Sequence, residues 1–172
     1  TGLSSYVTGA VNVTLSDQPT LAQLKAINNA TSGAITLGVT SGALSGTASD
    51  LAAAFAGTIT TYTGDLTITD AQSGASGVTA VNAIAAKTSG VVTATVSGTV
   101  SELNSLEETG NAYAITVTDT ATVAQLTAID GVTTGVLTYT SITDAALNVA
   151  AADGTGLSSY VTGAVNVTLS DQ

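Results

Sequence analysis

Three stretches of the chain place apolar residues at every third position ahead of a glycine. They are PTLAQLKAINNATSG (19–33), GVTAVNAIAAKTSG (77–90) and ATVAQLTAIDGVTTG (121–135), and they align without gaps when counted back from the glycine. Apolar residues at this spacing share one face of a helix, so each stretch predicts a helix with one buried face. The predicted structural core is Leu21, Leu24, Ile27, Val78, Val81, Ile84, Val123, Leu126 and Ile129.

After each of these glycines the apolar period changes from three to two, which predicts a strand. Ile35, Val92 and Leu137 begin these strands, with threonines on the alternate positions. The glycines themselves, Gly33, Gly90 and Gly135, are expected at the helix C-terminus, where glycine tolerates a left-handed backbone.

A second helix follows each strand, opening near Thr47, Thr99 and Thr143 with a hydroxyl that can cap it. The predicted bodies of these helices are 51–55, 103–107 and 147–151. They lead through glycine-bearing loops to the second strands DLTITD, AITVTD and NVTLSD, each of which ends in an aspartate.

The same organisation recurs along the whole chain, since residues 1–18 are identical to residues 155–172. We interpret 1–18 as the end of a preceding unit, followed by repeat units at 19–72, 73–120 and 121–172. Strands joined through helices should be parallel. The predicted fold is therefore α/β, one continuous solenoid domain of about 25 residues per coil and two coils per unit of ~51 residues, with a single sheet preferred. Such a window onto a longer array should stack end to end.

Composition narrows the function classes. The chain has no His, Cys, Trp, Met or Arg, and its only cations are Lys25 and Lys87. The net charge of −10 disfavours nucleic acid as a partner, and no apolar run is long enough to span a membrane. Glu107 and Glu108 are adjacent and would point about 100° apart on a helix, which does not suit a catalytic carboxylate pair. We expect no enzyme activity.

The phrases ATVAQLTAID, SITDAALNVAAAD and ITVTDT resemble helix-strand repeats of giant bacterial extracellular surface proteins, of the cyanobacterial hemolysin-like or adhesin-like type. The resemblance covers the whole chain. It implies an extracellular or cell-surface location, a structural or adhesive role, and stabilisation by calcium. The glycine-aspartate nonapeptide of RTX calcium-binding rolls is absent from this sequence.

The strand-terminal aspartates have two interpretations. Asp17, Asp70, Asp119 and Asp171 recur at one register and could bind Ca²⁺ through hard oxygen ligands. Alternatively, each carboxylate caps the helix that follows it. Other candidate sites are the glycosylation sequons at Asn12, Asn29 and Asn166, and the threonine pairs 67/69, 116/118 and 138/140, which could order water as ice-binding surfaces do.

Two functional hypotheses follow. The first is a structural repeat module that forms the shaft of an extracellular filament, sheath or adhesin by coil stacking and self-association, with cell-surface polysaccharide as a further partner. The second is an extracellular ligand-binding solenoid that presents its polar strand face to Ca²⁺, glycans or ice.

Overall fold

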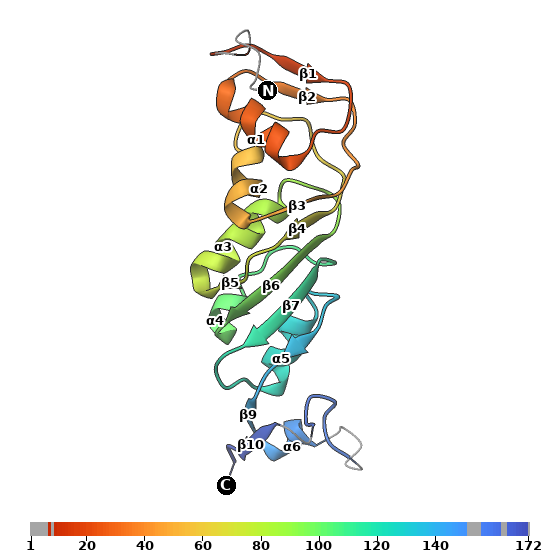
Figure 1. Cartoon of the computed structure of the whole chain (residues 1–172). Coiled ribbons are helices and arrows are strands. Elements are labelled where there is room, and N and C mark those ends of the chain that lie inside the picture. The colour runs from red at the N-terminus through yellow and green to blue at the C-terminus, as the bar shows by residue number, and fades with distance from the viewer. Residues whose placement is uncertain (1–6, 8, 151–155, 163–164, 172) are drawn as a thin grey trace. The chain divides into compact units, whose positions relative to one another are not determined.

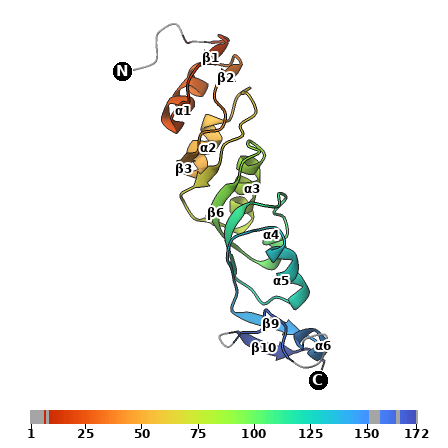
Figure 2. The same cartoon turned by 90° about the vertical axis from the view of Figure 1, so that its right-hand side faces the viewer.

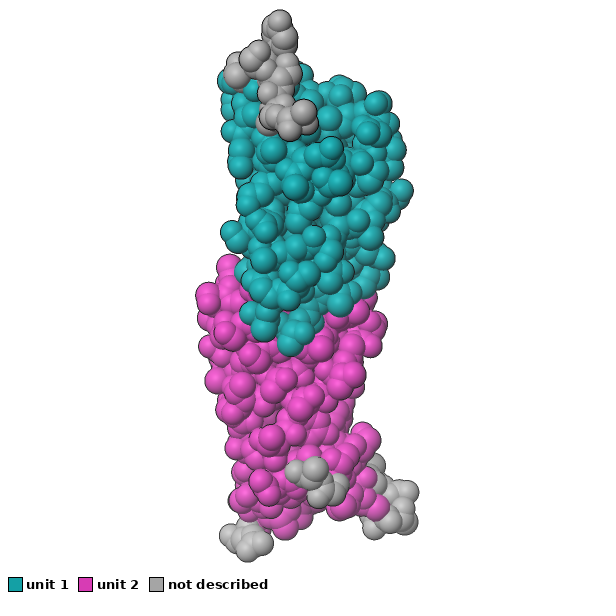
Figure 3. Space-filling model, viewed as in Figure 1, with its two compact units in different colours: residues 1–71, 80–95 teal, residues 72–79, 96–172 magenta. Residues whose placement is uncertain are grey.

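The computed structural model describes residues 7, 9–150, 156–162 and 165–171. The fold is α/β with mostly parallel strands, as predicted. Two compact units are distinguished, residues 1–71 with 80–95 and residues 72–79 with 96–172 (Figure 3). We call them unit 1 and unit 2.

Helices and strands follow one another along the described chain (Figure 1). In order they are β1 (Val13–Leu15), α1 (Leu21–Ala30), β2 (Ile35–Leu37), β3 (Leu44–Gly46), α2 (Ala48–Ala54), β4 (Leu66–Ile68), β5 (Gln72–Ser73), α3 (Gly74–Ala85), β6 (Val92–Gly98), α4 (Val100–Leu103), β7 (Ala112–Val117), α5 (Val123–Asp130), β8 (Leu137–Thr138), β9 (Ser141–Asp144), α6 (Ala146–Val149) and β10 (Asn166–Leu169). We call each helix together with the strands that follow it a helix–strand segment.

The three helices predicted from the period-three pattern are present as α1, α3 and α5. Helices α1 and α5 begin with capping boxes. The side chains of Thr20 and Thr122 accept hydrogen bonds from the backbone N–H groups of Gln23 and Gln125, and the side chains of these glutamines accept from the backbone N–H groups of the two threonines. These boxes satisfy N–H groups that have no partner within the helix.

The second set of helices is shorter than predicted in one case. Helix α4 ends at Leu103, whereas its predicted body ran from 103 to 107. Asn104 and Ser105 follow Leu103, and such side chains compete with the backbone for hydrogen bonds, which weakens a helix.

Helix α2 lies close to its predicted position, and Thr47 caps it. The predicted opening near Thr143 is wrong, because Thr143 belongs to β9 and the N-cap of α6 is Ala145, which has no side-chain hydroxyl to cap the helix.

Unit 1 pairs each strand with one from the next segment. Strand β1 pairs with β2 in the register Val13↔Ile35, and β3 pairs with β4, which in turn pairs with β6. All three pairs are parallel. Helices α1 and α2 pack against each other beside these strands (Figures 1 and 2).

Unit 2 uses the same arrangement. Strand β6 runs from unit 1 into unit 2, where β5 pairs with it and the strand order continues β6-β7-β8. Strands β7 and β8 are parallel, as are β9 and β10. The described strands thus belong to three sheets, which corrects the preference for a single sheet. Several strands have only two or three residues, so the hydrogen bonds between neighbouring strands cover short stretches of the chain.

The interior is built from the predicted helix positions and the inward faces of the strands. Seven of the nine predicted core residues are buried, and Leu21 and Val123 are half-buried at the first turn of their helices. Phe55 and Tyr62 are also buried, with their rings in edge contact at a centroid distance of 5.3 Å. Burying apolar side chains on one face of a parallel sheet stabilises each segment against its neighbours.

Candidate functional site

The strand-terminal aspartates accept hydrogen bonds from the first residue of the helix that precedes their strand. Their partners lie 2.7–3.0 Å away, and the pairs are Ala48 N to Asp70 Oδ1, Val100 N to Asp119 Oδ1, and Ala146 N to Asp171 Oδ1. Each acceptor stands at the end of the strand that follows the helix it caps, within the same helix–strand segment. The prediction that each aspartate caps the helix after it is therefore wrong in direction, although capping itself is present.

The calcium interpretation requires several carboxylates to converge on one ion. Among the described residues, no group of three or more His, Cys, Asp or Glu side chains is placed to hold a metal ion. Asp17 is exposed in the segment ahead of α1.

Asp144 performs the same capping role and was not recognised in the sequence as a member of this set. It ends strand β9, and its Oδ2 accepts from Val123 N at 2.9 Å, while Oδ1 accepts from Asn148 Nδ2 at 2.7 Å. These hydrogen bonds, that from Asn148 first, hold the pKa of Asp144 below its ordinary value. The sequence SITDAAL could have identified Asp144, because its aspartate ends a strand just as those of the other three strands do.

The threonine of each T-S-G or T-T-G step joins two segments. The hydroxyl of Thr88 donates to Gly64 O at 2.6 Å, and that of Thr133 donates to Tyr113 O at 2.7 Å. Thr31 makes the corresponding bond to Val11 O, and its hydroxyl also lies 2.9 Å from Gly9 O. In all three, the hydroxyl oxygen also accepts from the N–H of the glycine two residues on, at 2.9 Å. We call this arrangement the threonine clamp.

The glycine of the clamp is needed for space and not for a left-handed backbone. Among the described residues, positive φ occurs only at Gly9, Gly74 and Gly110, which corrects the expectation for Gly33, Gly90 and Gly135. A Cβ at Gly135 would lie 2.2 Å from Tyr113 O, and one at Gly33 would lie 2.4 Å from Val11 O. Only glycine lets the backbones of neighbouring segments approach this closely.

Polar residues directly before a strand make further contacts between segments. Asn12 Oδ1 accepts from Ala34 N at 2.9 Å, and Asp65 Oδ1 accepts from Val91 N at 2.8 Å. The shared pattern is Asn or Asp followed by an alternating strand, N-V-T-L and D-L-T-I, and this pattern could have identified both residues.

The acidic residue in the first turn of α2 or α4 contacts the helix of the preceding segment. Lys25 Nζ on α1 forms an ion pair with Asp50 on α2, and Ala75 N on α3 donates to Glu102 Oε1 at 3.2 Å. The bond from Lys25 lowers the pKa of Asp50, and bonds from Thr99 lower that of Glu102. Glu107 and Glu108 are exposed in the loop after α4.

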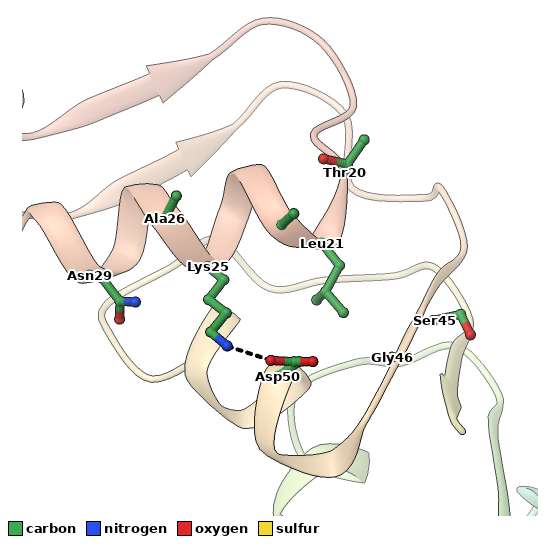
Figure 4. Close-up of a pocket in the computed structure, with 9 residues that line it drawn as sticks. Thr20, Leu21, Lys25, Ala26, Asn29, Ser45, Gly46 and Asp50 are labelled. Atoms are coloured by element: carbon green, nitrogen blue, oxygen red, sulfur yellow. Dashed lines mark hydrogen bonds and ion pairs between the residues drawn. The ribbon is translucent and has the colours of Figure 1, made fainter. Parts of the chain in front are cut away.

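A pocket of about 600 Å³ lies beside the Lys25–Asp50 pair in unit 1 (Figure 4). Its walls come from α1, β3 and α2, and Leu21 and Asn29 contribute to its lining. Both charged side chains of the pair are about 40% exposed, so the ion pair contributes little to stability. The pocket brings one amine and one carboxylate together, already paired with each other.

The other candidate residues lie on exposed surfaces. Asn12, Asn29 and Asn166 are all exposed, although Asn12 uses its amide oxygen in the contact described above. The solvent face of the strands carries opposed threonines, Thr14↔Thr36 and Thr67↔Thr93 in unit 1 and Thr116↔Thr138 in unit 2.

Comparisons of the chain with protein-family models, with curated proteins and with solved structures give no match. Within the part of the chain that the structure describes, no helix combines the length and the hydropathy needed to cross a membrane.

Proposed function

We propose that the chain is a structural repeat module, whose helix–strand segments stack as a parallel-stranded solenoid of about 25 residues per coil. In this proposal it forms the shaft of an extracellular filament, sheath or adhesin, and its partner is itself. Cell-surface polysaccharide is a further proposed partner.

The observation that carries the proposal is where the polar side chains are used. Threonine clamps and the pre-strand residues Asn12 and Asp65 hydrogen-bond the backbone of a neighbouring segment. The strand-terminal aspartates join their strand to the helix ahead of it in the same segment. A catalytic or binding site instead needs polar groups that converge on a ligand. Polar groups that hold parts of the chain together favour a structural role, in which the protein acts through its length and its internal cohesion. We propose no enzyme activity.

The extracellular or cell-surface location is part of the proposal and rests on the resemblance of ATVAQLTAID and SITDAALNVAAAD to repeats of giant bacterial surface proteins. Lack of cysteine is compatible with it, because hydrogen bonds and burial hold the segments together.

Electron microscopy of concentrated, purified protein with and without EDTA tests the proposal. Six coils at the spacing of parallel strands give an expected axial repeat of about 29 Å. Fibres with that repeat in both conditions are expected. Discrete particles at every concentration would contradict the filament role.

A second candidate function is supported by the exposed threonine pairs of the strand face. Hydroxyls at strand spacing on a polar surface suit binding of glycans or ice, and Ca²⁺ is a third ligand that this proposal includes. Replacing Thr93 and Thr116 by valine would keep the strand propensity and remove the hydroxyls. Loss of glycan binding or of ice recrystallisation inhibition in that variant would support this function, and a melting temperature lowered by EDTA would support its calcium form.

A further inference from the structure

Strands β1 and β10 share the duplicated sequence, but they use opposite edges of the strand to pair with their neighbours. In its first position, Val13 N donates to Ala34 O at 2.9 Å and Leu15 O accepts from Gly38 N at 2.7 Å, both from the neighbourhood of β2. In its second position, Asn166 N donates to Thr140 O at 2.9 Å and Ser170 N donates to Asp144 O at 3.0 Å, on the side of β9.

These two sets of backbone groups do not overlap. Asn166 and Ser170 correspond to Asn12 and Ser16 in the duplicated sequence, whereas β2 is bound through Val13 and Leu15. Alternate residues of a strand direct their backbone groups to opposite sides. One strand of this sequence therefore has a complete set of groups for β9 on one edge and for β2 on the other.

The exposure of the apolar side chains also differs between β10 and β1. Val167 and Leu169 of β10 are each 38% exposed, whereas their counterparts in β1, Val13 and Leu15, are half-buried beside β2. Covering β10 with a strand like β2 would remove apolar surface from water.

We propose that β10 of one copy binds β2 of a second copy, in place of that copy's own β1. This proposal rests on the proposed function and specifies how copies join. The contacts exchanged are equivalent because the residues are identical: Val165 O would take the position of Val11 O against Gly33, and Asn166 the position of Asn12 against Ala34 N.

Two effects oppose the replacement of β1 by β10 of another copy. The tethered β1 competes at an effective concentration of the order of millimolar, so the joined state is a minor one in dilute solution. Each copy also carries a net charge of −10, so added salt should favour joining by screening repulsion. A covalent trap is therefore the appropriate assay.

The chain has no cysteine, so introduced cysteines report unambiguously. Thr14 and Thr36 are direct partners in the β1–β2 register, and the proposal places Thr168 of one copy opposite Thr36 of the next. Parallel partners lie within the Cα separation that a disulfide spans. A Thr168→Cys chain mixed with a Thr36→Cys chain under mild oxidation should give a heterodimer, increased by salt and lost on adding excess peptide of residues 1–18.

Thr118 is exposed and directly follows β7, and Thr118→Cys is the matched control for Thr168→Cys. Equal heterodimer from the control mixture would overturn the proposal. A second variant, Thr14→Cys with Thr36→Cys in one chain, locks β1 onto β2 when oxidised. The locked protein should not assemble until it is reduced.

The outcomes separate the two proposals. Fibres from the oxidised locked variant would refute strand replacement and leave the filament role standing. A specific Thr168–Thr36 heterodimer without fibres would support strand replacement and contradict the filament role. No heterodimer above the control would refute strand replacement, whatever electron microscopy shows.

Discussion

Replacing Gly135 with alanine should destabilise the protein through a clash between segments. The added Cβ would lie 2.2 Å from Tyr113 O and 2.7 Å from its carbonyl carbon, and both atoms are backbone atoms that cannot rotate away. Overpacking of this kind typically costs about 1–3 kcal/mol, and a backbone partner places Gly135→Ala in the upper part of that range.

Urea unfolding followed by circular dichroism measures the effect. A loss of about 2 kcal/mol with an m-value of about 2 kcal/mol/M lowers the midpoint by about 1 M. Gly131→Ala is the matched control, because the glycine lies four residues earlier with φ −66° and its nearest Cβ contacts are at an ordinary 3.4 Å. The control should be unchanged or slightly stabilised through lower chain entropy in the unfolded state.

Gly135→Asn distinguishes the close approach from a requirement for a left-handed backbone. Asparagine tolerates the left-handed region better than alanine does, so a φ requirement would make Gly135→Asn the milder change. The close approach predicts that both substitutions destabilise. A midpoint for Gly135→Ala within error of the original protein would refute the packing argument for all three clamp glycines.

The other predictions concern the core, the caps and pH. Leu126→Asp, at a fully buried position, should lower the melting temperature strongly, while Ala128→Asp on the exposed face of α5 should not; an unchanged melting curve for Leu126→Asp would refute the core assignment. Asp119→Ala removes the acceptor for Val100 N and should cost about 1 kcal/mol in urea unfolding, against no effect for the exposed Glu108→Gln. The pKa values of Asp144 and Glu102 are lowered in the folded state, so the unfolded chain takes up protons first as pH falls. Stability from these groups is then present above the ordinary carboxyl range and lost below about pH 4. Urea midpoints from pH 6 to pH 2 should fall less in Asp144→Asn, and parallel curves would contradict the assignment.

Much of the local structure could be predicted because it depends on neighbours in sequence. The spacing of Leu24 and Ile27, and of Leu126 with Ile129, is enough to predict a helix and its buried face. Alternation in the strands likewise predicts which residues face inward, and short helical connections predict parallel pairing.

What could not be predicted depends on parts of the chain that are distant in sequence. Gly135 stands at a helix end in the sequence, and nothing local indicates that Tyr113 O lies against it. Asp70 stands just before α3, so local reasoning assigns it to that helix, but the parallel ladder carries it to the first turn of α2 instead. Both errors concern contacts between residues that are far apart in the sequence, which local sequence patterns do not specify.

The spacing of these contacts along the chain has a kinetic consequence. Strand partners in either unit are separated by only about 20 to 26 residues, as in Val13↔Ile35, Leu66↔Val92 and the bond from Thr118 N to Gly98 O. That separation is set by the segment and not by the length of the polypeptide, so in the proposed repeat array extra segments would add no more distant contacts. If the proposed array is correct, folding nucleates at any adjacent pair of segments and spreads outward, and each step should take nearly the same time in a short array and in a very long one.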